Sequence, residues 1–174
     1  MLFSSLVFLF GFLPIVILVY SLSRPELSNY ILLFFSVLFY AWGGVSITSL
    51  LLFSIALNYL FVKQIAKHNA YRHKWLITGL ITNISILVFY KYLHFFIQNI
   101  NDLVGLFNGG KEVVENTNIA LPLGISFFTF HQMSLLWDVY RDRPKNDIKF
   151  FDTALYITFF PQLVAGPIVR YKDI

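Results

Sequence analysis

The sequence contains no cysteine, and only 13% of its residues are charged. The lack of cysteine excludes disulfides, thiolate chemistry and cysteine-ligated metal sites in this chain. Soluble domains average about 25% charged residues, so half that fraction indicates a membrane protein. The rest of the composition agrees, because 57% of the residues are hydrophobic, 19% are aromatic and the mean hydropathy is +0.69.

Acidic residues are also few, and the net charge is +4. The basic residues lie in loops that flank apolar runs, as the positive-inside rule describes for membrane proteins. No basic patch interleaved with exposed aromatic residues lies outside the apolar runs, and no residues have metal-ligand spacing. We therefore expect a lipid bilayer as the surroundings of the chain, no nucleic-acid partner and no metal.

The first apolar run covers residues 5–22. As a helix, it would extend about 27 Å, enough to cross the hydrocarbon core of a bilayer. It has no basic n-region and no small-residue cleavage site before Arg24, so we expect a retained transmembrane helix rather than a signal peptide. Pro14 in the middle of the run predicts a kink.

A polar hinge over residues 23–29 leads into an apolar run over residues 30–62. A single helix of that length would reach about 50 Å, well beyond the hydrocarbon thickness. Gly43 and Gly44 divide the run, so we expect two helices in a tight hairpin. Asn58 lies in the second helix, where an amide needs a hydrogen bond to a neighbouring helix.

The next three segments predict one crossing of the membrane. Residues 63–74 are basic and should be cytoplasmic, residues 75–97 should form a helix, and the polar residues 99–118 should lie outside. Lys91 and His94 share one face near the end of this helix. They either reach to the interface or hold an anionic substrate.

Residues 119–138 form the most polar of the membrane segments, with proline and glycine expected in the first turn. A polar stripe within a bundle faces protein or water rather than lipid. His131 could act as a proton carrier or general base, but no carboxylate or second histidine stands at a telling spacing. Packing or cavity lining is therefore the favoured role. Asp138 and Arg141 are expected to pair or cap the helix at the cytoplasmic face. The polar residues of the segment are Ser126, Thr129, His131, Gln132, Ser134 and Asp138.

The last apolar segment, residues 150–169, contains Pro161, Gly166 and Pro167 and is followed by Arg170. Prolines and glycine interrupt the backbone hydrogen-bond ladder, and lipid cannot satisfy the groups that they free. The segment is therefore expected to be a broken helix that helps line a cavity inside the protein. A complete crossing would also place Arg170 outside, against the charge rule, which favours a segment that re-enters or stops within the membrane.

Together these segments predict an all-α fold: a polytopic transmembrane helix bundle with Pro/Gly-broken helices and about six membrane segments. Five stretches resemble, in the same order, the N-terminal part of the membrane-bound O-acyltransferases. The similarity is greatest to the bacterial branch that includes the alginate O-acetylation membrane protein, and the D-alanyl transfer protein of teichoic acids is a more distant relative. The five stretches are residues 1–5, 39–43, 121–130, 138–141 and 159–171.

This resemblance implies that residues 1–174 are a single membrane domain, the first part of an enzyme of roughly eleven crossings in the cell inner membrane. Members of this branch move an acyl group, usually acetyl, from a cytoplasmic donor such as acetyl-CoA or another acyl thioester. The acceptor is a hydroxyl of an extracytoplasmic polysaccharide, commonly reached through a partner acetyltransferase, as in alginate biosynthesis. The resemblance implies no bound cofactor. The family's histidine lies in a later helix, so we assign no catalytic residue here and expect this stretch alone to be inactive.

The resemblance also implies four substrate-binding residues: Arg170, Gln162, His131 and Gln132. Arg170 either contacts the anionic donor or serves as a structural ion pair or interfacial anchor. Gln162 either donates a hydrogen bond to a thioester carbonyl or satisfies backbone freed by Pro161. His131 stands where relatives often have glutamine, so it does not replace the family's histidine. Two other functions stay open: a transporter or flippase subunit, and a structural membrane fragment without chemistry.

Overall fold

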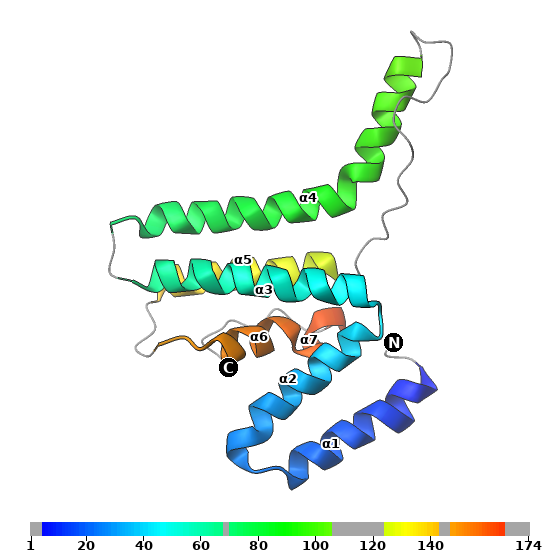
Figure 1. Ribbon diagram of the computed structural model, residues 1–174, viewed down its shortest axis with the longest axis vertical. Coiled ribbons are helices and arrows are strands. Elements are labelled where there is room, and N and C mark those ends of the chain that lie inside the picture. The colour runs from blue at the N-terminus through cyan, green and yellow to red at the C-terminus, as the bar shows by residue number, and fades with distance from the viewer. Residues whose placement is uncertain (1–4, 68–69, 106–123, 143–146, 166–174) are drawn as a thin grey trace.

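The computed structural model describes residues 5–67, 70–105, 124–142 and 147–165, and within these ranges the regular structure is entirely helical (Figure 1). The prediction of an all-α fold is confirmed. The elements are a π-helix η1 (Phe8–Phe12) and the helices α1 (Leu13–Leu22), α2 (Pro25–Ala41), α3 (Val45–Ala66), α4 (Arg72–Gly105), α5 (Ile125–Arg141), α6 (Phe150–Thr158) and α7 (Phe160–Ala165).

At Pro14, where a kink was predicted, the helix has a widened turn. The N–H of Leu13 donates to the carbonyl of Phe8, five residues back, and η1 runs directly into α1. Proline has no N–H, and its ring clashes with the carbonyl four residues before it. A π-type turn makes room for that ring, so the first apolar run stays helical throughout.

The polar hinge expected over residues 23–29 is mostly helical, so this prediction was wrong. Arg24 is extended, and α2 begins at Pro25. Proline suits the first helical position because its missing N–H would have no partner there and its φ angle is already helical. The hairpin expected next is confirmed, because Gly44 adopts a φ of +134° between α2 and α3, which other residues rarely reach.

Helices α3 and α5 and the first part of α4 lie side by side, and the end of α4 bends away from them (Figure 1). Gly79 allows this close packing, since a Cβ atom there would lie 2.7 Å from Cδ1 of Leu136. α4 is longer than predicted, so the start of the expected outer loop is helical. Gly124 is the N-cap of α5, with a φ of +74°, rather than part of its first turn. Pro122 lies outside the described residues.

The last apolar segment is broken, as predicted. α6 ends at Thr158, Phe159 leaves the helix with φ −50° and ψ 106°, and α7 begins at Phe160. The break directly precedes Pro161, which has no N–H to continue the ladder. Gly166 and the residues after it lie outside the described part of the chain.

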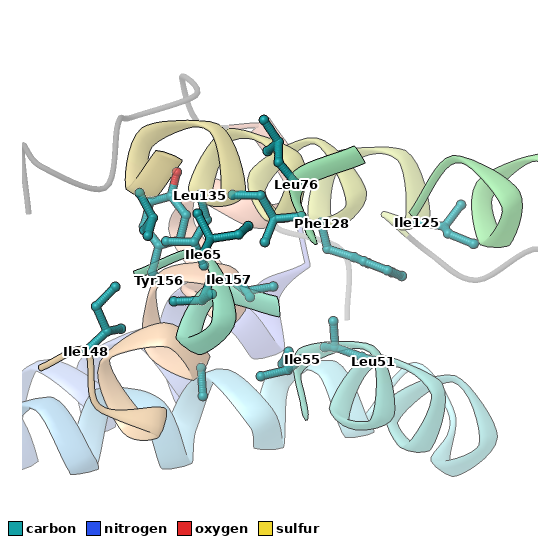
Figure 2. Packing of buried hydrophobic residues seen from close by; sticks show 14 of the residues in the cluster. Leu51, Ile55, Ile65, Leu76, Ile125, Phe128, Leu135, Ile148, Tyr156 and Ile157 are labelled. Carbon is teal, nitrogen blue, oxygen red and sulfur yellow. The ribbon is translucent and has the colours of Figure 1, made fainter. Parts of the chain in front are cut away.

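Two apolar clusters hold the helices together. The larger lies between α3, α4, α5 and α6 (Figure 2) and includes Leu51, Ile55, Ile65, Leu76, Phe128, Leu135, Tyr156 and Ile157. The smaller joins η1 and α1 to α2 and α7 through Phe8, Val16, Phe39 and Phe160. Phe160, directly after the break, therefore anchors α7 to the first hairpin.

The outer surface is strongly apolar. In the described part of the chain, more large hydrophobic side chains are exposed than buried. Two helices, Val45–Ala66 and Arg72–Leu93, are long and apolar enough to cross a membrane, with mean hydropathies of 2.0 and 1.5. Only 33% and 17% of their most apolar windows are buried, whereas a soluble core helix would be mostly buried. This surface is typical of a membrane protein.

Candidate functional site

The candidate site lies where the broken helix packs against α2. The rings of Tyr30 on α2 and Phe151 on α6 are 5.2 Å apart. Beyond the end of α6, the N–H of Phe160, the first residue of α7, donates to Oγ of Ser36 further along α2 at 3.3 Å. α2 and α6 are therefore parallel neighbours. Ser36 is fully buried, and its hydroxyl satisfies an N–H at the break. Protein rather than lipid satisfies the broken backbone, as the sequence predicted.

A cavity of about 500 Å³, called the α2–α6 groove below, lies between these elements. The lining residues that α6 contributes after Asp152 are three and four positions further along the sequence, so together they lie on one face of that helix. Asn29 and Asp152 make one end polar, Gln162 makes the other end polar, and the middle is apolar. Its lining residues are Asn29, Leu32, Asp152, Leu155, Tyr156, Phe159 and Gln162.

Gln162 is the predicted site residue that lines the groove. Its Oε1 is buried and has no hydrogen-bond partner in the described part of the chain. The backbone N–H of Gln162 donates to the carbonyl of Phe159 at 3.0 Å, and Oγ of Ser36 accepts a hydrogen bond from the N–H of Phe160. A buried amide oxygen without a partner is costly, so it is ready to accept a hydrogen bond from a bound molecule.

His131 and Gln132 lie behind the wall of the groove, and both are buried residues of α5. His131 is 1% exposed, and its ring centroid is 5.8 Å from that of Tyr156. Both of its ring nitrogens are buried without a partner among the described residues. Oε1 of Gln132 accepts a hydrogen bond from Ser54 at 2.9 Å, while its Nε2 has no partner there. The favoured packing role of His131 agrees with this burial. Arg170 lies outside the described residues.

Sequence reasoning missed the polar end of the groove at Asn29 and Asp152. Asn29 was counted as part of a hinge, but it belongs to the first turns of α2. Asp152 stands in the first turn of α6, where a carboxylate is favoured by the helix dipole. A carboxylate two residues into an apolar segment was the available signal for this end of the site.

Asn58 makes the helix–helix hydrogen bond that the sequence predicted. Its Nδ2 donates to Oδ1 of Asn83 on α4 at 3.0 Å, and Nδ2 of Asn83 donates back to Oδ1 of Asn58 at 2.7 Å. Each amide also donates to a backbone carbonyl four residues earlier, of Ser54 and Gly79 respectively. Both side chains are 1% exposed, so the pair is a buried and satisfied link between α3 and α4.

Arg72, at the start of α4, joins the ends of two other helices. Its Nε donates to the carbonyl of Ile65 on α3 at 2.7 Å, and its Nη2 donates to that of Tyr140 on α5 at 3.0 Å. The guanidinium also lies over the Tyr140 ring, 5.3 Å from its centroid. The last carbonyls of a helix lack partners and carry negative dipole charge, which a cation stabilises.

The same end of the bundle carries exposed cations and the Asn29–Asp152 end of the groove, because α6 begins directly after Lys149. Arg141 and Asp138 were expected to pair or to cap the helix, and the structure shows the guanidinium of Arg141 donating to Asp142 at 3.0 Å. This pair is exposed, so it contributes little to stability. The exposed cations at this end include Lys63, Lys67, Lys74, Arg141 and Lys149.

An apolar surface around a helical bundle with a groove beside α2 and α6 is typical of a helical membrane protein. Over its whole length the chain is similar to alginate O-acetylases, in agreement with the predicted resemblance to the membrane-bound O-acyltransferases. It is 36% identical over its whole length to the probable alginate O-acetylase AlgI of Pseudomonas aeruginosa. It is 37% identical over its whole length to that of Pseudomonas syringae, and 35% identical over 99% of its length to the peptidoglycan O-acetyltransferase of Helicobacter pylori.

The chain spans only part of these relatives: 34%, 34% and 38% of their respective lengths. No family model matches the sequence, and no solved structure matches it.

Proposed function

We propose that the chain is part of an O-acyltransferase that moves an acetyl group from a cytoplasmic acyl thioester to a hydroxyl of an extracytoplasmic polysaccharide. The observation that carries this proposal is the similarity, over essentially the whole chain, to proteins named for the O-acetylation of alginate and of peptidoglycan. These two named acceptors share one chemistry, because both are glycans with sugar hydroxyls.

The proposed surroundings are the cell inner membrane, which the chain crosses several times. The membrane segments are η1 with α1, then α2, α3, α4, α5, and the broken pair α6–α7, which makes six. The end that carries Arg72 and the exposed lysines faces the cytoplasm, because basic loops remain on that side. The Asn29–Asp152 end of the groove then also lies toward the cytoplasm, where a thioester donor such as acetyl-CoA is available.

The α2–α6 groove is proposed to receive the acyl part of this donor. Gln162, at the end of the groove away from Asn29 and Asp152, is suited to bind the thioester group. Its Nε2 can donate to a carbonyl oxygen, and its Oε1 can accept from an N–H or O–H group. In the transfer, the hydroxyl oxygen attacks the thioester carbonyl, the C–S bond breaks, and the hydroxyl proton passes to the departing thiolate. A donor placed at the carbonyl stabilises the negative charge that develops there. The base for the hydroxyl would lie in a part of the enzyme beyond these residues.

Arg170 remains a predicted contact for the negative charge of the donor, and a partner acetyltransferase outside the membrane remains a predicted recipient of the acetyl group. Both proposals depend on the family resemblance. In the intact protein, Arg170→Ala should reduce acetyl transfer and leave membrane insertion unchanged. Unchanged acetate on the polysaccharide would remove Arg170 from the site.

The test of the proposed function is the O-acetyl content of the cell's exopolysaccharide and peptidoglycan after deletion of the gene. Acetate should fall and return on complementation with the intact gene. After complementation with Gln162→Leu, the protein should be present in the membrane, but the acetate on the polysaccharide should not return. Normal acetate after deletion, with reduced export of polysaccharide, would instead support a transporter.

A further inference from the structure

The outer edge between α4 and α5 gathers aromatic rings at the end of the bundle that carries Arg72. The ring centroid of His73 on α4 lies 6.0 Å from that of Tyr140 on α5. The ring centroid of Trp137 on α5 lies 6.2 Å from that of Tyr140, and the guanidinium of Arg72 lies over the same Tyr140 ring. These contacts place one side of α4 against one side of α5. The edge formed by His73, Ile77, Trp137 and Tyr140 is called the α4–α5 seam below.

Away from this end, the seam continues as an exposed apolar strip. Because α4 begins where α5 ends, Ile77 and Trp137 both lie about one turn deeper in the bundle than the ring contact between the two helices. Ile77 is 42% exposed and Trp137 is 51% exposed. Ile84 and Phe130 lie two turns further from this end, continue the same two helix faces and are exposed as well. A ligand that lies along this strip therefore needs a long apolar part.

The polar end of the seam carries positive charge. Lys74, in the first turn of α4, is exposed, and its Nζ lies 5.2 Å from the centroid of the Tyr71 ring. Arg141, the last residue of α5, is exposed too and shares its charge with Asp142, and Arg72 is a third cation at this end. Tryptophan and tyrosine beside cations are typical of the level at which lipid headgroups lie. The polar part of the ligand is therefore expected to be an anionic headgroup.

We propose that the α4–α5 seam binds an anionic phospholipid of the cytoplasmic leaflet. The headgroup phosphate lies near Lys74, and the acyl chains follow Ile77 and Trp137 into the hydrocarbon region. Basic sites between transmembrane helices on the cytoplasmic side bind such headgroups, whereas a soluble anion would satisfy only the polar end of the seam. The inference uses the membrane orientation proposed above but not the acetyl transfer, and its helices differ from those that line the α2–α6 groove.

The test locates and measures lipid binding to the intact protein in vesicles of phosphatidylcholine. The probe is phosphatidylglycerol with a photoreactive diazirine in one acyl chain, and the residues that it labels after irradiation are identified by mass spectrometry. Label is expected on Ile77, Trp137 and their neighbours along the seam. Phosphatidylcholine with the same diazirine chain should label these residues less, because its headgroup has no net charge. Equal labelling by the two lipids would overturn the proposal.

Lys74 is the residue whose charge the test removes. Lys74→Gln should lower the affinity for the phosphatidylglycerol probe about 5-fold, the effect of one cation near an anionic lipid headgroup. Lys74→Arg keeps the charge and should retain the affinity. Lys63→Gln is the matched control, because Lys63 is also exposed and lies over a tyrosine ring, that of Tyr59, at 5.4 Å. It stands away from the seam, since Tyr59 packs against Phe150 of α6.

Three results would contradict a lipid site at this seam. An equal loss of labelling in Lys74→Gln and Lys63→Gln would show that only the overall charge of this end attracts the probe. Inorganic phosphate that displaces the probe more than chloride does at equal ionic strength would indicate a site for a free anion. An absence of label on α4 and α5 would show that another part of the intact protein covers the seam. None of these readouts depends on acyl transfer, so the proposed function is tested separately by the acetate content of the polysaccharide.

Discussion

The Asn58–Asn83 pair allows the sharpest test of the packing between α3 and α4. Replacing one member by leucine removes two hydrogen bonds between the helices, of 3.0 and 2.7 Å, and leaves the other amide buried without its partner. Replacing both members by leucine removes the polar groups altogether. Leucine has the same number of side-chain heavy atoms as asparagine and branches at the same carbon, so neither change opens a large cavity.

The expected energies follow from the number of bonds. Hydrogen bonds between transmembrane helices contribute about 0.6 kcal/mol on average and up to about 1.7 kcal/mol, so two of them amount to about 1–3 kcal/mol. A buried amide left unsatisfied costs about 1–3 kcal/mol, whereas removal of both partners is often close to neutral. Asn58→Leu and Asn83→Leu should therefore each destabilise the protein, and the double variant should be less destabilised than the sum of the two by about 1–3 kcal/mol.

The assay is the free energy of unfolding of the intact protein in mixed detergent micelles, titrated with a denaturing detergent for all four members of the cycle. Asn99→Leu, on the exposed part of α4, is the control and should change stability little. Additive single effects would show that the two amides do not interact and would refute the assigned register of α3 against α4.

Three further predictions concern stability in the same assay. Arg72→Met should cost about 1.5–3 kcal/mol, since it removes charged hydrogen bonds to the ends of α3 and α5; a variant as stable as wild type would contradict this role. Gly79→Ala brings a Cβ to 2.7 Å from Leu136, and the resulting strain of about 1–3 kcal/mol should exceed the gain in helix propensity of about 1 kcal/mol; increased stability would show that α4 is not packed this closely. Ser36→Ala leaves the N–H of Phe160 unpaired and should cost about 1–3 kcal/mol, whereas Ser36→Thr should retain the bond; equal stability of the two variants would contradict the contact.

The sequence predicts best what depends on a single segment. Asn58 in an apolar run needs a partner wherever it lies, and a proline within an apolar run distorts the helix locally, by a widened turn at Pro14 and by a break before Pro161. The structure confirms the predicted partner of Asn58 and the predicted break. The partners themselves, Asn83 and Ser36, could not be found in the same way. They depend on which helices meet and in what register, and Ser36 is 124 residues from the N–H that it satisfies.

The same limit applies to the candidate site. Gln162 could be singled out because it sits beside a helix break, but the groove also needs Asn29 from α2 and Asp152 from α6. These residues come together only because α2 and α6 are parallel neighbours. Helix boundaries were missed for a local reason instead: Pro25 was taken as part of a hinge, although proline is well suited to begin a helix.

The most direct test of a groove that admits the donor into the membrane-embedded bundle uses single introduced cysteines. Residues 1–174 contain no cysteine, and any cysteine in the rest of the intact protein is first replaced by serine. Leu155→Cys lies in the groove, and Leu60→Cys lies on the exposed apolar face of α3, with 58% of Leu60 exposed. The intact protein is studied in inside-out membrane vesicles, where a water-soluble maleimide should modify Leu155→Cys and acetyl-CoA should slow this reaction. Leu60→Cys faces lipid and should stay unmodified, because its thiol remains protonated there. Modification of Leu155→Cys no faster than that of Leu60→Cys would contradict the presence of such a groove.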